Sequence, residues 1–469
     1  MSPESIATAS IAVLSRAMEN GNTTASAVTA ACIERAEDFN PVCKAYIEVL
    51  DETAMIQAAD LDRGPRRGQL HGIPFGVKDM IDCKDVATTA GSAVLHDRIA
   101  QDDAHAVAML KDAGANCLGK LNLHEFAYGA TGENALYGTA VNAYDRTRLA
   151  GGSSSGSAAA VAWGLLPFTL GTDTGGSVRA PAALNGLVGF KPTYGRVSVR
   201  GVIPYCWSLD HVGIITRTVS DAALVLQEIA RPDPADLGCA KVAVDDYVNA
   251  TLAVDDLSGS RIGVPRGFFY ESVDAEICAA TDRAIRFLES KGATIKDVAL
   301  PEMTHTRTVS LTIQMPEALS YHMPWLDERG DLYGVDFRAG LALGQNLLAE
   351  HYVRAKRMLT IYRTEVDRVF NDVDALITPA TPSIAPKLGA GNVTTDGLTE
   401  PAGNAITRFT SFFNMTGHPA ITLPSGLHST GLPMGVQLVG KQFGEAGLLR
   451  LASIIDTNPD FNVPTASVH

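Results

Sequence analysis

The chain is most informative where it reads Leu149-Ala-Gly-Gly-Ser-Ser-Ser-Gly-Ser157 and, after one apolar segment, Gly171-Thr-Asp-Thr-Gly-Gly-Ser177. Both stretches are typical of loops rich in glycine and serine. A third signal lies upstream and reads His71-Gly-Ile-Pro-Phe-Gly-Val-Lys78-Asp-Met-Ile-Asp82. One lysine and two serines in this arrangement can form a hydrolytic site that needs no histidine.

The second loop has the composition of an oxyanion-binding loop. Two glycines precede Ser177, and they let successive backbone N–H groups turn toward one point. Such donors stabilise the negative charge that develops during acyl transfer. The predicted donors are the amides of Thr174, Gly175, Gly176 and Ser177. The alternative is a glycine-rich turn that only precedes a helix.

A serine hydroxyl is a weak nucleophile unless a base accepts its proton. Lys78 ends an apolar strand, where burial would populate the neutral amine that a base requires. The alternative is a salt bridge from Lys78 to Asp79 or Asp82. His71 and His124 fit no catalytic motif, and we expect both to be packing or surface residues.

One competing motif overlaps the first loop. Gly152-Ser-Ser-Ser-Gly156 matches the G-x-S-x-G nucleophile elbow, with Ser154 as the nucleophile. That elbow requires a buried apolar strand directly before it. Residues 142–149 are instead polar and turn-like, so the elbow is disfavoured.

Short apolar runs alternate with helical patterns along much of the chain, which predicts a mixed, twisted α/β sheet covered by helices on both faces. We expect a single domain over residues 1–469. Within it, residues 1–65 form a helical N-terminal layer, 66–230 the catalytic region, and 231–469 the remainder. A helical excursion near 305–360, rich in Met, His, Trp and Tyr, would cover the pocket. Residues 383–403 are expected to form a long loop.

Composition limits the partners and the compartment. The formal net charge is −14, which predicts no nucleic-acid partner and no membrane partner. Seven scattered cysteines without a CxxC pair indicate reduced thiols in a cytoplasmic protein and no metal site. No leader sequence is evident, and no apolar run approaches the ~18 residues of a membrane span.

Taken together, the motifs resemble the amidase signature family of serine hydrolases over nearly the whole chain. The three stretches quoted above stand in the family's order and spacing. Further matching segments are Gly189-Phe-Lys-Pro-Thr-Tyr-Gly-Arg196, Ser208-Leu-Asp-His-Val-Gly213, Gly417-His-Pro-Ala-Ile-Thr-Leu-Pro424 and Gly431-Leu-Pro-Met-Gly-Val-Gln-Leu-Val-Gly440. One departure is Ser155, where many members have glycine.

The resemblance implies the amidase signature fold and a Ser–cisSer–Lys triad. Ser177 would be the nucleophile, Ser153 the bridging serine after a cis peptide, and Lys78 the base. Asp173 and Arg179 would brace the nucleophile loop, and Ser154 is assigned a further structural role. No metal and no organic cofactor are expected. Substrate contacts are expected from residues Ala127, Tyr128, Gly129 and Ser153.

The implied function is hydrolysis of a C–N bond in a linear amide, an anilide or a carbamate, so that the enzyme would be an amidase, an aryl acylamidase or a urethanase. The expected partner is then a small-molecule substrate, and the protein a monomer or homodimer. The alternative is the A subunit of a glutamyl-tRNA(Gln)-type amidotransferase, acting as a glutaminase, although residues 320–360 look more like generic amidases. The third and weakest reading is a non-catalytic scaffold.

Overall fold

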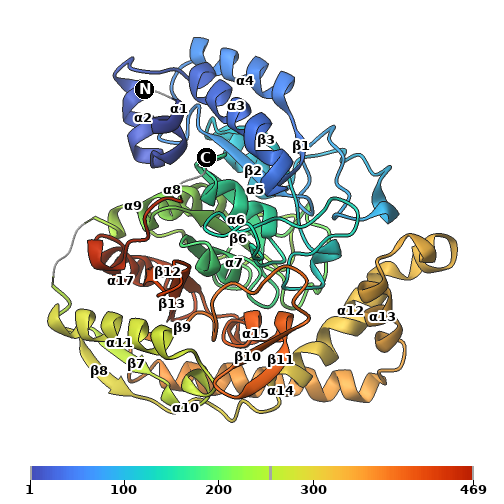
Figure 1. Ribbon diagram of the computed structural model, residues 1–469, viewed down its shortest axis with the longest axis vertical. Coiled ribbons are helices and arrows are strands. Elements are labelled where there is room, and N and C mark those ends of the chain that lie inside the picture. Colours follow the sequence, from blue (N-terminus) through green and yellow to red (C-terminus); the bar gives the residue numbers. More distant parts are fainter. Residues whose placement is uncertain (1–2, 253–255, 467–469) are drawn as a thin grey trace.

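The computed structural model describes residues 3–252 and 256–466 (Figure 1). In this part of the chain, eleven strands form one large sheet. In spatial order the strands are β1 (Tyr46–Val49), β3 (Asn116–Leu121), β2 (Pro74–Lys78), β4 (Phe168–Thr172), β6 (Val212–Thr216), β5 (Val188–Lys191), β12 (Ala420–Leu427), β13 (Pro433–Gly440), β9 (Ala375–Pro379), β7 (Arg261–Val264) and β8 (Thr294–Asp297).

The sheet is mixed, as the sequence predicts. Strand β2 runs parallel to both β3 and β4, and β7 runs parallel to both β8 and β9. Antiparallel pairs join β1 to β3, β4 to β6, β6 to β5, β5 to β12, β12 to β13 and β13 to β9. The two parallel groups are therefore connected by a central antiparallel block.

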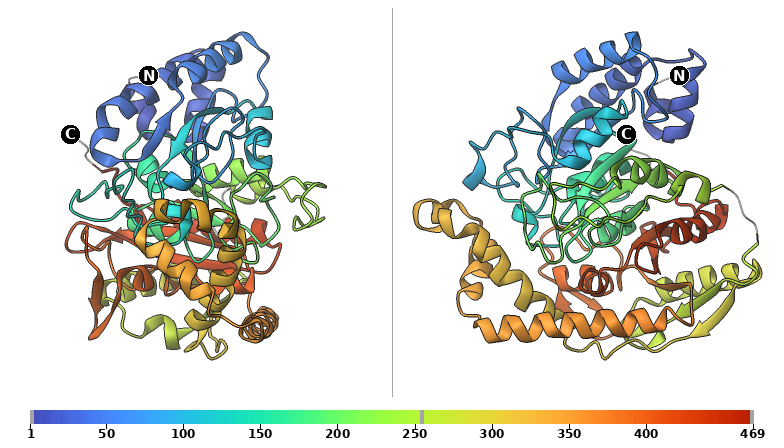
Figure 2. Two further views of the ribbon diagram at one scale, coloured as in Figure 1. Left: turned by 90° about the vertical axis from the view of Figure 1, so that its right-hand side faces the viewer. Right: turned by 180° about the vertical axis from the view of Figure 1, so that it is seen from behind.

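Helices surround this sheet (Figures 1 and 2). The helices up to residue 250 are α1 (Pro3–Thr8), α2 (Ile11–Glu19), α3 (Ala25–Cys43), α4 (Asp51–Arg63), α5 (His105–Asp112), α6 (Ser155–Ala162), α7 (Arg179–Leu184), α8 (Val219–Ile229) and α9 (Tyr247–Ala250). Those after it are α10 (Arg266–Tyr270), α11 (Ala275–Ser290), α12 (Thr306–Arg329), α13 (Val335–Gly344), α14 (Ala349–Val369), α15 (Ala402–Thr407), α16 (Phe412–Thr416) and α17 (Glu445–Asp456). Short 3-10 turns are η1 (Ala93–Leu95), η2 (Glu125–Ala127), η3 (Gly330–Leu332) and η4 (Pro459–Phe461).

Strand β6 shows why both faces of the sheet are covered. Successive side chains of a strand point to opposite faces. Val212 and Ile214 pack into the core that contains the apolar side chains of α8. Ile215 packs into a separate core that contains the alanines of α6. Helices α8 and α6 therefore lie on opposite faces, and the expected two-sided covering is confirmed.

The N-terminal segment is helical with one exception. Thr24 caps α3 through a hydrogen bond from the Ala27 amide to its hydroxyl, as its position before an apolar helical pattern predicts. Residues 46–49 were expected within a helical layer but form strand β1, which pairs antiparallel with β3. The edge of the sheet offers backbone partners that local periodicity does not reveal.

The segment 383–403 is not a simple loop. It contains a two-stranded hairpin of β10 (Asn392–Thr395) and β11 (Leu398–Pro401). Its two turn residues, Asp396 and Gly397, both have positive φ, of 44° and 80°. Asp-Gly in that conformation is the favoured two-residue connection between antiparallel strands. The glycine-rich composition hid this local turn signal.

The parallel pairing of β2 with β4 positions the candidate site. Val77 lies opposite Leu170, so both strands end at the same edge of the sheet. Lys78 is the last residue of β2, and the second glycine-rich loop begins where β4 ends. Helix α6 starts at Ser155, directly after the first loop. Two loops and one lysine are thus brought to one place.

Gly156 tests how closely α6 approaches the sheet. A Cβ at this position would lie 2.2 Å from the Ala45 carbonyl oxygen and 2.4 Å from the Asn122 amide nitrogen. We therefore expect Gly156→Ala to lower the free energy of unfolding by about 1–3 kcal/mol, as overpacking does. Urea unfolding of the purified protein measures this change.

Gly447 in α17 is the matched control, because a Cβ there meets nothing within 4 Å. Gly447→Ala should raise stability by about 0.5–1 kcal/mol, since alanine loses less entropy than glycine in a helix. Equal effects of the two substitutions would contradict the close packing of α6.

Candidate active site

Lys78 occupies a closed position behind the two loops. Its side chain is fully buried, and its Nζ donates hydrogen bonds of 2.7 Å to Ser153 Oγ and of 2.7 Å to Thr172 Oγ1. Burial lowers the pKa of Lys78 to about 7, although the charges of Asp210 and Asp173 oppose the shift. Near neutral pH the amine is therefore available as a proton acceptor. Thr172 was not predicted to contribute, although it lies within the second loop signal.

The salt bridges proposed as an alternative for Lys78 do not form. Asp79 pairs with Lys120 at 3.0 Å, and Asp82 pairs with Arg98 at 2.6 Å. Lys78 therefore keeps its hydrogen bonds to the hydroxyl groups of Ser153 and Thr172. The alternative reading of this lysine is therefore wrong.

The first loop holds Ser153 in place through its backbone. The Gly152–Ser153 peptide is cis. The Ser153 carbonyl accepts a hydrogen bond from the His124 amide. Ser154 connects the two loops, because its hydroxyl donates to the Thr172 carbonyl at 3.0 Å and its amide donates to the Ser177 carbonyl. Ser154 is fully buried, which agrees with a structural position and not with an exposed elbow nucleophile.

Ser177 faces a cavity of about 180 Å³. In the described part of the chain, its hydroxyl makes no hydrogen bond to protein. The lining residues are Ala127, Tyr128, Gly129, Ala130, Thr174, Gly175, Ser177, Tyr205, Arg307, Leu311, Gln314, Gly403, Thr407 and Ser411. Three of the four predicted substrate contacts, Ala127, Tyr128 and Gly129, thus lie at the cavity. Ser153 is fully buried and is not among the lining residues described, so its predicted direct substrate contact is not seen.

The oxyanion loop differs from prediction at one position. The Gly176 amide already donates to Asp173 Oδ1 at 2.8 Å. The amides of Thr174, Gly175 and Ser177 make no hydrogen bond within the described residues. The expected set of four donors is therefore reduced to three here. Gly176 instead allows the conformation of the loop. Its φ is +121°, and a Cβ there would lie only 1.8 Å from Thr410 Oγ1, so a larger residue would not fit.

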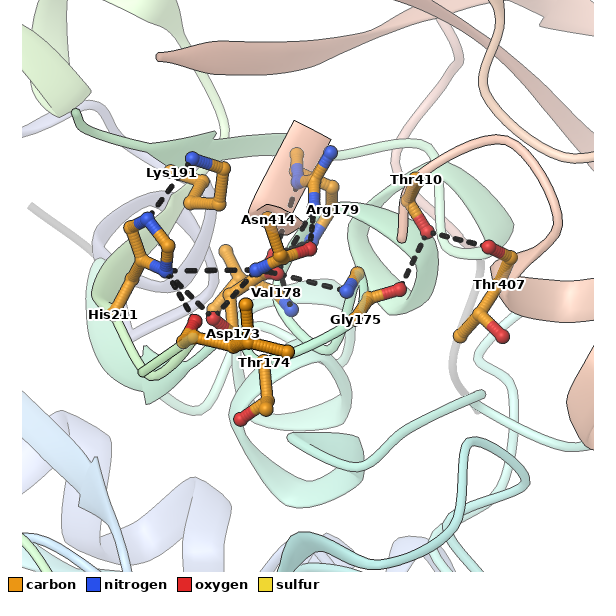
Figure 3. Close-up of polar contacts among 12 residues, drawn as sticks. Asp173, Thr174, Gly175, Val178, Arg179, Lys191, His211, Thr407, Thr410 and Asn414 are labelled. Atoms are coloured by element: carbon orange, nitrogen blue, oxygen red, sulfur yellow. Dashed lines mark hydrogen bonds and ion pairs between the residues drawn. The ribbon is translucent and has the colours of Figure 1, made fainter. Parts of the chain in front are cut away.

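A buried ion pair braces the second loop (Figure 3). Arg179 donates to both carboxylate oxygens of Asp173, each at 3.0 Å, and both side chains are fully buried. Arg179 also donates to Asn414 Oδ1 and Gln437 Oε1, each at 2.7 Å. Thr410 donates to the Gly175 carbonyl at 2.9 Å. The predicted pairing of Asp173 with Arg179 is present, and residues from the C-terminal part complete it.

Two opposing effects set the pKa of Asp173. Burial raises it, whereas the charge and hydrogen bonds of Arg179, with smaller contributions from Lys191 and Asn414, lower it. The net pKa lies well below the ordinary value. The carboxylate is therefore charged at any pH at which the enzyme would work, and the pair remains intact.

The two histidines considered earlier have other partners than the three residues of the predicted triad. His71 contacts the Leu61 carbonyl at 3.1 Å, and His124 contacts Asp336 at 2.9 Å. Among residues 3–252 and 256–466, no cluster of three His, Cys, Asp or Glu side chains could hold a metal ion. In the same ranges, no helix is both long enough and apolar enough to cross a membrane.

Comparison with known proteins agrees with this geometry. The amidase family model matches residues 27–449. The chain belongs to the amidase family. It is therefore an enzyme that acts on C–N amide bonds, with the amidase signature fold.

Three relatives illustrate the range of the family. The A subunit of the glutamyl-tRNA(Gln) amidotransferase from Chloroflexus aggregans is 38% identical over 95% of both chains. A chain from a vestigial protein complex, described as revealing the origins of an s-triazine catabolic enzyme, is 33% identical, with a TM-score of 0.93 over 97% of this chain and 100% of that one. The native peptide amidase of Stenotrophomonas maltophilia is 31% identical, with a TM-score of 0.83 over 95% and 96%.

These relatives correct the expectation about partners. The acidic composition led to the exclusion of nucleic acid, and the implied amidase function to a small-molecule substrate as the expected partner. A relative that matches over 95% of the chain is one subunit of an enzyme named for glutamyl-tRNA(Gln). The exclusion is therefore wrong. Net charge averages over a whole surface and does not decide which molecules a protein works with.

Removing one partner of the buried ion pair should be costly. Asp173→Asn would leave Arg179 charged and uncompensated in the interior, so we expect unfolding free energy to fall by about 3–5 kcal/mol. Urea unfolding followed by circular dichroism measures this loss. The control is Asp331→Asn, which removes the exposed partner of Arg338 and should leave stability unchanged. Similar losses in both variants would refute the bracing role.

Proposed function

We propose that this chain hydrolyses a small linear amide through a seryl acyl-enzyme at Ser177. One observation carries the proposal. A fully buried lysine with a pKa of about 7 lies 2.7 Å from Ser153, and Ser177 lines the adjacent cavity. A lysine that is neutral near neutral pH can act where other serine hydrolases use histidine.

In the proposed mechanism, two proton transfers activate the nucleophile. Lys78 accepts the proton of the Ser153 hydroxyl, and Ser153 accepts the proton of Ser177. The Ser177 oxygen then attacks the amide carbonyl. The resulting oxyanion would be stabilised by the amides of Thr174, Gly175 and Ser177, which have no acceptor among the described residues.

Collapse of the tetrahedral intermediate breaks the C–N bond. The protonated Lys78 returns its proton through Ser153 to the leaving nitrogen, and the acyl group stays on Ser177. A water molecule then attacks the ester and loses its proton along the same path. Ser177 is regenerated, and the acid product departs.

Of the two biological readings, the comparisons support the amidotransferase reading more strongly. The identity of 38% to the A subunit of such an enzyme extends over 95% of the chain, which outweighs the impression that residues 320–360 look more like generic amidases. On this proposal the chain is a glutaminase that releases ammonia within an assembly. Likeness to a peptide amidase supports the second candidate, in which the chain acts on a free amide itself.

The anilide and carbamate readings have less support. The cavity of about 180 Å³ is smaller than the ~300–1,000 Å³ of most drug-sized ligand pockets. Several aromatic side chains of the helical excursion pack with one another, as His322 does with Phe337, and His322 also packs against Phe126 outside it. The excursion instead gives the cavity Arg307, Leu311 and Gln314. A bulky aryl group would need space that these contacts fill.

The lowered pKa of Lys78 predicts a pH profile. Protonation removes the base, so kcat/KM should fall about tenfold per pH unit below about pH 7 and level off above it. Initial rates of ammonia release from about pH 5 to pH 9 test this profile. Lys78→Ala should lower kcat/KM by several orders of magnitude and abolish its dependence on pH. A rate that keeps rising to about pH 10 would mean an ordinary, solvated lysine.

A substrate panel tests the function itself. We expect ammonia release from glutamine or a small primary amide, and its loss in Ser177→Ala, because Ser177 is the proposed nucleophile. A nitroanilide and an aryl carbamate should react at least about tenfold more slowly. The measurement is product release by wild type and variant, alone and with copurified partner proteins.

Each contrary outcome of the panel has a distinct meaning. Turnover that survives Ser177→Ala would overturn the acyl-enzyme. Fastest turnover of the aryl carbamate would restore the urethanase reading. Glutamine hydrolysis that appears only with copurified partners would favour the amidotransferase reading over the free amidase.

A further inference from the structure

The cavity at Ser177 contains a charge that the proposed chemistry does not use. Arg307 lies in the first turn of α12 and lines the cavity together with Ser177. Among the described residues that line it, Arg307 is the only charged one. A single cation at the wall of a small reaction cavity calls for an explanation in a protein whose net charge is −14.

Arg307 is not neutralised by the protein around it. Within residues 3–252 and 256–466, no hydrogen bond and no ion pair reaches its guanidinium. Glu400 is the carboxylate that acts on it, and Glu400 is paired with Arg408. The Arg307 side chain is exposed at the cavity. Partial desolvation by its neighbours lowers its pKa, and Tyr205, Tyr128 and Glu400 oppose this shift. The group stays charged, since arginine is always protonated in proteins.

The other polar side chains on the same wall are mostly satisfied. Tyr205 donates to Gln314 Oε1 at 3.0 Å, and the Gln314 amide donates to Ser310 at 2.6 Å. Tyr128 also lines the cavity, and its hydroxyl, which lies beside Gly340 of α13, makes no hydrogen bond in the described part of the chain. Arg307 is therefore a charged donor without an acceptor among the described residues, at the space that a substrate would occupy.

We propose that Arg307 binds a carboxylate of the substrate, so that the preferred substrate is an amide that also carries a carboxylate. The planar guanidinium matches a carboxylate with two parallel hydrogen bonds, which a neutral amide cannot reproduce. The small cavity places this carboxylate only a few bonds from the carbonyl that Ser177 attacks. The inference rests on the proposed function, because it assumes that Ser177 attacks that amide.

Binding to an inactive variant tests the inference without depending on turnover. Succinamate and butyramide are suitable probes, because both are short linear amides and only succinamate carries a carboxylate. In the Ser177→Ala protein, titration calorimetry should show succinamate binding at least about tenfold tighter than butyramide. Adding Arg307→Gln should lower the affinity for succinamate at least about tenfold and change the affinity for butyramide by no more than about twofold.

Two further variants separate binding from folding and from net charge. Arg307→Lys keeps the positive charge but loses the two parallel donors of the guanidinium. This variant should retain part of the preference for succinamate. Arg338→Gln removes the same charge from α13, where Arg338 pairs with Asp331 outside the cavity, and should change neither affinity. Thermal unfolding of each variant checks that the fold is kept.

The inference is overturned if Arg307→Gln leaves the affinity for succinamate unchanged, if it weakens both probes equally, or if Ser177→Ala binds succinamate no better than butyramide. Wild-type turnover of the two probes is read separately. Binding of succinamate through Arg307, without hydrolysis of either probe or of glutamine by the chain alone or with copurified partners, would refute the proposed function and leave the carboxylate site standing.

Discussion

The loop that carries Ser177 depends on the buried ion pair between Asp173 and Arg179. Two opposite charges out of water are tolerated only where their remaining hydrogen-bonding groups are also satisfied. Asp173 meets this demand by accepting from the Gly176 and Val178 amides, and Arg179 by donating to Asn414 and Gln437. The electrostatic requirement thus fixes the path of the backbone on either side of Ser177.

Much of this molecule could be predicted from local sequence, and the limits follow from physics. Thr24 as a helix cap and the strand that ends at Lys78 depend on neighbours within a few residues. The partners of Arg179 cannot be predicted from nearby residues, because Asn414 lies 235 residues further along the chain. Periodicity reports which face a side chain takes, not which distant residue it meets. Strand β1 was missed for the same reason.

Charge shows the same contrast between average and local properties. The overall count suggested a protein that avoids polyanions, whereas one relative belongs to an enzyme named for a tRNA. At the cavity, Arg307 is the only charged residue among the described lining residues, so the local charge there is positive although the chain as a whole is acidic. Lys78 illustrates the reverse case, where the surroundings remove a charge.

The Gly175 carbonyl is held by Thr410, and the ion pair by Asn414 and Gln437. All three contacts come from the C-terminal end of the chain, whereas Lys78, Ser153 and Ser177 are synthesised early. A chain that ended before Thr410 would contain all three of these residues but none of the contacts that hold the loop around Ser177. Removal of the last 60 residues would therefore disturb a loop that lies more than 200 residues earlier in the sequence.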